Sequence, residues 1–104
     1  MDEVTSATFA DEVLASPVPV IVDFWAPWCR PCDAIDPHLR SLAEAWGGRV
    51  RLVRVDVDAE PGLSSRYSVL SLPTVVLFVG GEAKATVHGA QSRDRYERAF
   101  AEFL

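Results

Sequence analysis

The two cysteines of the chain, Cys29 and Cys32, lie where an apolar run ends and a helical pattern begins. The run Val18–Trp25 is apolar on both faces, as in a central parallel strand, and only Asp23 interrupts it. After the cysteines, apolar residues recur every three or four positions up to Trp46, which predicts an amphipathic helix. Cysteines at i and i+3 of a first helical turn lie on one face about 5–6 Å apart, and a disulfide can bridge that separation. The chain must therefore fold around a strand–helix junction that carries a closable thiol pair.

Hydrophobic periodicity also predicts the elements that precede this junction. We expect an edge strand at Val4–Thr5, followed by a helix that opens with a capping box at Thr8–Asp11. That helix should bury Phe9 and Val13 on one face and end at Pro17.

The second half of the chain alternates between strand and helix patterns in the same way. We expect a strand at 50–57, a short helix from Glu60 to Tyr67 and a strand at 74–79. A hairpin at Gly80-Gly81 should then lead into a strand that buries Ala83, Ala85 and Val87. A final helix, capped by Ser92, should turn Tyr96, Phe100 and Phe103 inward. The element order is βαβαβαββα, which predicts an α/β fold with a mixed sheet and helices on both faces. Residues 1–104 fit one domain.

Charge and hydropathy exclude several classes of function. The net charge of −5 and a pI of about 4.8, with no basic face, argue against a nucleic-acid partner. The longest apolar runs, Val18–Val22 and Val75–Val79, are far shorter than a membrane span. The chain starts with acidic residues and lacks the pattern of a secretory signal, so we expect a cytoplasmic protein without membrane contact. In a reducing cytosol, a CxxC motif indicates a catalytic or a metal-binding pair.

Catalysis is the favoured interpretation of this pair. Cys29 stands at the predicted helix N-terminus, where unpaired N–H groups and the helix dipole stabilise a thiolate, the attacking species in disulfide exchange. Cys32 is one turn further in, so we assign Cys29 as the exposed nucleophile and Cys32 as the shielded resolving thiol. Two alternatives are inert buried thiols and a zinc site. For zinc, only His38, His88 and carboxylates remain as ligands, their spacing matches no zinc pattern, and we expect no metal.

Asp23 is a carboxylate within a strand that is predicted to be buried on both faces. Desolvation should raise its pKa, because burial disfavours the charged form. The alternative is that Asp23 points into solvent from an edge strand.

Several motifs, taken together, resemble the thioredoxin family. They are WAPWCRPC after an apolar strand with one Asp, a helix that contains a proline, SLPT before a strand, and a late Gly-Gly hairpin. The resemblance covers essentially the whole chain and implies a thioredoxin fold, with a central mixed sheet of about five strands flanked by helices on both faces. In two places the chain departs from the family: Arg30 replaces the usual Gly between the cysteines, and Asp33 follows Cys32 where Lys is common.

The resemblance also implies roles for individual residues. The residue matching Asp23 transfers a proton at the resolving cysteine, and the peptide bond before Pro73 is cis. A cis Pro73 would present the backbone of Leu72 to an extended substrate by strand addition; the alternative is an ordinary trans turn. Arg54 lies where the family often has Lys near the buried acid. From the residues themselves, we expect Arg30, Pro31 and Pro73 to tune the redox potential, and Trp28, Leu72, Pro73, Gly89 and Ala90 to bind substrate.

A protein-disulfide reductase of the thioredoxin type is therefore the predicted function. The resemblance implies a flavin- and NADPH-dependent thioredoxin reductase and protein disulfides as partners, with no cofactor bound by this chain itself. We expect a monomer. Arg30 leaves an oxidant or isomerase role open, and a non-catalytic binding or chaperone module is the alternative from another class.

Overall fold

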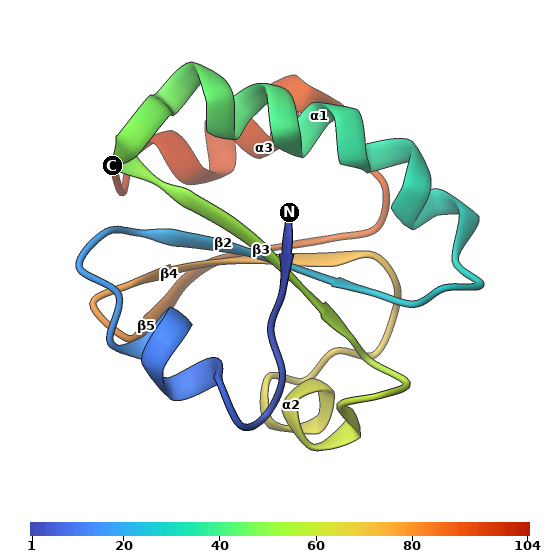
Figure 1. Cartoon of the computed structure of the whole chain (residues 1–104). Helices are drawn as coiled ribbons and strands as arrows, with labels where there is room; N and C mark the ends of the chain where they lie inside the picture. Colours follow the sequence, from blue (N-terminus) through green and yellow to red (C-terminus); the bar gives the residue numbers. More distant parts are fainter.

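Five strands form one mixed sheet in the computed structural model, which describes all residues from Met1 to Leu104 (Figure 1). The strands are β1 (Asp2–Glu3), β2 (Val20–Trp25), β3 (Arg51–Asp56), β4 (Thr74–Val79) and β5 (Glu82–His88), in the spatial order β1-β3-β2-β4-β5. β3 pairs in parallel with β1 and β2, whereas β4 is antiparallel to both β2 and β5. The predicted fold class is confirmed, and the predicted apolar run forms the middle strand of the sheet.

Helices cover both faces of this sheet. Figure 1 shows α1 (Arg30–Trp46) and α3 (Arg93–Ala101) on one face, and α2 (Pro61–Arg66) with the short π-helix η1 (Ala10–Leu14) on the other. A 3-10 turn, η2 (Gly47–Arg49), follows α1. None of these helices combines the length and apolar character needed to cross a bilayer.

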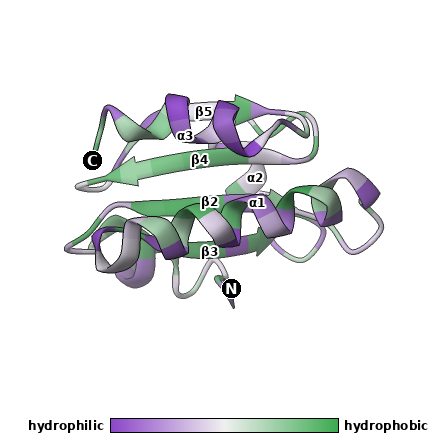
Figure 2. Cartoon of the chain, turned by 90° about the horizontal axis from the view of Figure 1, so that it is seen from above, coloured by the Kyte–Doolittle hydropathy of each residue, from purple (hydrophilic) through white to green (hydrophobic).

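Each face of the sheet has its own apolar core because side chains alternate along a strand. Val20, Val22 and Phe24 of β2 belong to the core under η1 and α2. Ile21 belongs to the core under α1 and α3, together with Leu39 and Leu42 of α1 and Tyr96 and Phe100 of α3. The strands β2 and β4 are largely hydrophobic, whereas β3 mixes apolar and charged residues and α1 alternates between polar and apolar faces (Figure 2). By the same alternation, Asp23 lies on the face that α1 and α3 cover.

The predictions for the N-terminal segment are partly wrong. The edge strand lies at Asp2–Glu3, just before the predicted position. The capping box does not form: Thr8 Oγ1 accepts a hydrogen bond from the N–H of Thr5 at 3.0 Å, and Ala10 opens a π-helix without a side-chain cap. Phe9 and Val13 are buried as predicted, but the helix ends at Leu14, before Pro17.

Two predictions of burial near the C-terminus are also wrong. Ala83 is exposed, because the pairing of β4 with β5 shifts register between Leu77 and Phe78 and only the far half of β5 faces the core. Phe103 lies beyond the end of α3 and is 36% exposed. The predicted cap of α3 is confirmed, since the side chain of Ser92 accepts a hydrogen bond from the N–H of Arg95 at 3.1 Å.

Candidate active site

The two cysteines form a disulfide across the first turn of α1. Their Cα atoms are 5.3 Å apart, within the predicted range. Cys29 is the N-cap of α1, and its sulfur accepts a hydrogen bond from the N–H of Cys32 at 3.2 Å. Pro31, inside the first turn, has no N–H to satisfy and its fixed φ suits the helix start. After reduction, the Cys32 N–H and the positive end of the helix dipole are expected to favour the thiolate of Cys29.

Burial of the sulfurs differs from the prediction. Cys29 is 3% exposed and Cys32 is 2% exposed, so the expected exposure of Cys29 is wrong for this disulfide form. The bond draws both sulfurs into one small cluster with Ala26, against which Trp25 and Leu72 pack. The two cysteines therefore differ in their position on the helix rather than in their exposure.

The residues beside the disulfide are exposed. Trp28 is 67% exposed, and its indole N–H donates to Asp58 Oδ2 at 2.7 Å. Arg30 and Pro31 are exposed as well, and the guanidinium of Arg30 has no ion-pair partner. Three predicted site residues, Trp28, Arg30 and Pro31, thus lie at the surface next to the buried cysteines.

A second segment reaches the cysteine cluster from the start of β4. The Leu72–Pro73 peptide bond is cis, as the resemblance implied. Leu72 is half-buried and packs against the cluster of Ala26, Cys29 and Cys32.

The loop after β5 is attached to this proline. The N–H of Gly89 donates to the Pro73 carbonyl at 2.8 Å, and the neighbouring Ala90 is exposed. The structure therefore brings Leu72, Pro73 and Gly89 together with the disulfide, although the sequence separates them widely.

Asp23 is fully buried, and neither of its carboxylate oxygens has a hydrogen-bond partner. Burial is the main cause that raises the pKa of Asp23 to about 7, and the negative charge of Asp36 on α1 adds to it. The positive charge of Arg54 lowers this pKa and the charge of Glu3 raises it. The predicted raised pKa is confirmed, and the alternative of a solvent-facing Asp23 is wrong.

Arg54 lies beside Asp23 in the sheet but is engaged elsewhere. The two residues are register partners across β2 and β3. The guanidinium of Arg54 forms an ion pair with Glu3 and stacks 3.9 Å from the centre of the Trp25 ring. Its charge therefore reaches the carboxyl of Asp23 through space and not through a hydrogen bond.

Two hydrogen-bonding residues of this region were not predicted as part of the site. Asp58 follows β3, which is parallel to β2, and the carboxyl ends of parallel strands meet at one edge of a sheet. The sequence could therefore have placed Asp58 near the residues that follow β2, Trp28 among them. Tyr96 was predicted only as a core residue. A buried tyrosine hydroxyl needs a partner, but the sequence does not reveal which one.

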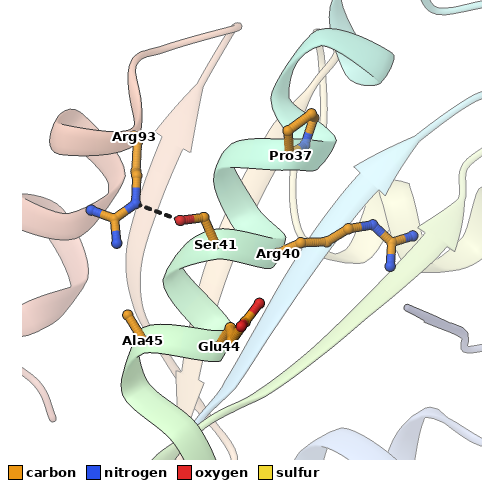
Figure 3. Close-up of a pocket in the computed structure, with 6 residues that line it drawn as sticks. All are labelled: Pro37, Arg40, Ser41, Glu44, Ala45 and Arg93. Atoms are coloured by element: carbon orange, nitrogen blue, oxygen red, sulfur yellow. Dashed lines mark hydrogen bonds between the residues drawn. The ribbon is translucent and has the colours of Figure 1, made fainter.

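A surface cavity of about 530 Å³ lies elsewhere, along α1 and α3 (Figure 3). Its lining residues are Pro37, Arg40, Ser41, Glu44, Ala45 and Arg93. Arg93 donates to the Ser41 hydroxyl at 2.9 Å, whereas Arg40 extends away from Arg93 (Figure 3). Because its charged groups do not converge and no predicted site residue lines it, this cavity is separate from the cysteine site.

The Cys29–Cys32 pair can pass between dithiol and disulfide with little backbone movement, and the half-buried Leu72, followed by the buried Pro73, packs beside it. These features place the chain among the thiol–disulfide exchange proteins of α/β fold. The family model for thioredoxin matches residues 1–102, and the chain belongs to the thioredoxin family.

Individual relatives agree with this assignment. Thioredoxin 1 of Nostoc sp. is 44% identical over 88 residues, which cover 85% of this chain and 82% of that protein. The thioredoxin of Porphyra purpurea is 35% identical over 104 residues, covering 100% of this chain and 97% of that protein. The chloroplastic thioredoxin M4 of Arabidopsis thaliana is 42% identical over 93 residues, covering 89% of this chain and 48% of that protein.

The chain is accordingly a thiol–disulfide oxidoreductase that reduces protein disulfides. It uses disulfide substrates and a reductase partner, as members of this family do in general.

Proposed function

We propose that Cys29 attacks the substrate disulfide and that Cys32 resolves the mixed disulfide. The observation that carries this proposal is the N-cap position of Cys29, whose sulfur already accepts the Cys32 N–H. In the reduced protein, the Cys29 thiolate attacks one substrate sulfur, an intermolecular disulfide forms, and the other substrate sulfur leaves as a thiolate. Cys32 then loses its proton and attacks the Cys29 sulfur. The Cys29–Cys32 disulfide forms, the second substrate thiolate leaves, and two electrons have passed to the substrate.

Asp23 is our proposed acceptor for the proton of Cys32. A group with a pKa of about 7 gains and loses a proton readily near neutral pH, which suits an acid–base catalyst. Asp23 also lies on the face of the sheet that α1 covers, and α1 carries Cys32 in its first turn.

The substrate-binding surface in this proposal consists of Trp28, Leu72, Pro73, Gly89 and Ala90. Leu72 packs against the disulfide, and Gly89 is bonded to Pro73, so an extended segment could pair with this edge while its disulfide meets Cys29. We further propose that Arg30, Pro31 and Pro73 tune the redox potential. Arg30 and Pro31 adjoin Cys29 in the first turn of α1, and Pro73 follows Leu72.

The proposed reductase is a flavin- and NADPH-dependent thioredoxin reductase, acting on residues 1–104 as one monomeric domain. We propose a cytoplasmic location, where such a reductase would keep the cysteine pair reduced. The alternative is a chloroplast, since the relatives include chloroplastic proteins.

A coupled assay tests the reductase: NADPH oxidation should require the reductase, this protein and insulin together. If NADPH is not consumed while dithiothreitol still supports insulin reduction, the partner is a different reductase.

Trapping of mixed disulfides tests the order of the two cysteines. Cys32→Ser should accumulate a covalent complex with insulin, because the attack by Cys29 still occurs and resolution does not. Cys29→Ser is the matched control and should trap none. Equal trapping by the two variants, measured on non-reducing gels, would contradict the assignment.

A further inference from the structure

The hydroxyl of Tyr96 connects the core to the loop after β5. Tyr96 is fully buried on α3, and its Oη donates to the carbonyl of Gly89 at 3.0 Å. The same oxygen accepts a hydrogen bond from the N–H of Gln91 at 3.3 Å. The hydroxyl thus bonds to the two residues that flank Ala90: it donates to Gly89 and accepts from Gln91. Ala90 itself is exposed.

The loop that Tyr96 holds is the one attached to the cis-proline. The N–H of Gly89 donates to the Pro73 carbonyl at 2.8 Å, and the side chain of Gln91 donates to the carbonyl of His88 at 3.2 Å. Gly89 has φ of 78°, a conformation that glycine adopts without steric cost. A continuous path of hydrogen bonds therefore runs from the buried hydroxyl, through Gly89, to Pro73.

The ring of Tyr96 is held in the core, and its hydroxyl stays a donor. The ring belongs to the core that α1 and α3 form with the sheet, and it lies 6.3 Å from the ring of Phe100. Burial raises the pKa of Tyr96 above its ordinary value, so the hydroxyl keeps its proton at neutral pH.

We propose that Tyr96 is a positioning residue, which fixes Gly89–Gln91 against Pro73 and so preorganises the edge that receives protein substrates. The inference rests on the proposed function, in which Pro73, Gly89 and Ala90 bind substrate. A loop that is already ordered loses less conformational freedom when an extended chain pairs with it, which strengthens binding. A small disulfide needs to reach only the sulfurs and does not pair with the loop. Its reduction should therefore not depend on how well Gly89–Gln91 is ordered.

Steady-state reduction of insulin with dithiothreitol as reductant tests the inference for a protein substrate. The rate with a small disulfide comes from stoichiometric oxidation of the pre-reduced protein, freed of dithiothreitol, by 5,5′-dithiobis(2-nitrobenzoate). Tyr96→Phe keeps the ring and removes only the hydroxyl. We expect the KM for insulin to rise about threefold to tenfold, the range for the net loss of about one hydrogen bond. The kcat for insulin, the rate with the small disulfide and the redox potential should stay unchanged.

The matched control is Tyr67→Phe. Tyr67 packs against Phe9 and Phe78 on the opposite face of the sheet, and its hydroxyl makes no hydrogen bond within the protein. This control should leave the KM and kcat for insulin, the rate with the small disulfide and the redox potential unchanged. The inference would be overturned if Tyr96→Phe gave the same values as Tyr67→Phe, or if it reduced the rates with both substrates equally.

Amide exchange in the unaltered protein gives a second test that needs no variant. The N–H of Gln91 should exchange slowly although its loop is at the surface, because its acceptor is the buried hydroxyl. Fast exchange of this amide would also overturn the inference. Failure of the proposed cysteine order is a different result, since Cys32→Ser and Cys29→Ser would then trap insulin equally.

Discussion

Arg30 is a charge that differs from the usual family residue and adjoins the attacking sulfur. Its side chain is exposed and has no ion-pair partner, so its field at Cys29 is not cancelled locally. Asp33 has the opposite sign, but it is also exposed and stands one residue beyond Cys32. A guanidinium close to a thiolate stabilises the reduced, charged form relative to the disulfide, and this raises the reduction potential.

Replacement of Arg30 by Gly should therefore lower the reduction potential of the protein. One pKa unit of thiolate stabilisation corresponds to about 1.4 kcal/mol, or about 30 mV for a two-electron couple. Because solvent screens an exposed charge, we expect a decrease of less than about 30 mV that becomes smaller at high salt. Redox equilibria against glutathione, at low and high salt, measure this change. An equal or higher potential for Arg30→Gly would refute the electrostatic account, and a salt-independent difference would indicate an effect of backbone stiffness.

Residue patterns were sufficient to predict the cysteine pair, the buried acid and its raised pKa. The hydrogen bonds of Trp28 to Asp58 and of Tyr96 to Gly89 could not be predicted in the same way. Each joins residues whose proximity depends on the packing of separate elements, and nothing in the local sequence specifies a partner for a side-chain donor.

At the scale of elements, long periodic segments were predicted better than short ones. The bounds of α1 and β4 agree with the sequence pattern, because each has many apolar side chains. Those of α1 pack into the core on one face of the sheet, and those of β4 are shared between the cores on both faces. The N-terminal helix is only five residues long, and a single local competition decides its start. There Thr8 bonds back to Thr5 instead of capping the helix, which the spacing of residue types did not reveal.

The hairpin between β4 and β5 depends on a tertiary contact as well as on its turn. Gly80 and Gly81 both have positive φ, of 59° and 83°. A Cβ atom at Gly81 would lie 3.0 Å from the carbonyl oxygen of Leu14, at the end of η1, whereas a Cβ at Gly80 would meet nothing within 4 Å. The turn therefore packs closely on the backbone of η1 at Gly81.

Alanine at each glycine separates these two effects. Gly80→Ala should lower the free energy of unfolding by about 1–2 kcal/mol, the cost of a left-handed conformation for a residue with a Cβ. Gly81→Ala should cost at least about 1 kcal/mol more, because the backbone of Leu14 must also move. Urea denaturation of both variants measures the difference, and equal losses would show that the contact with Leu14 is unimportant.

At the scale of the whole molecule, topology gathers the site at one edge of the sheet. β2 and β3 are parallel, so the cysteines after β2 and Asp58 after β3 lie at the same end. β4 is antiparallel to β2 and begins at this end, where Leu72 precedes it. β5 is antiparallel to β4 and returns there, which brings in Gly89. The order of strand patterns thus predicts which segments meet, while the distances between them depend on packing.

The buried Asp23 links this site to the stability of the whole fold. Its pKa is about 7 in the folded disulfide form, against about 3.9 for a free Asp. Between these values the folded state binds more protons than the unfolded state, so this residue makes stability fall as the pH rises. Its destabilising effect is absent below about pH 4, grows through that window and is complete above about pH 7. A difference of about three pKa units corresponds to roughly 4 kcal/mol as an upper limit.

Asp23→Ala should remove this loss of stability. In the disulfide form the cysteines do not titrate, and we expect the variant to be more stable than the unaltered protein above pH 7. The advantage should shrink as the pH falls toward 4, where the protonated carboxyl costs less to bury and the variant retains only its small cavity. Denaturant titrations of both proteins at several pH values measure the difference, with Asp11→Ala as a control because Asp11 is exposed. A stability difference between Asp23→Ala and the unaltered protein that does not change from pH 4 to pH 8 would show that Asp23 keeps an ordinary pKa, and it would then be unsuited to accept a proton from Cys32.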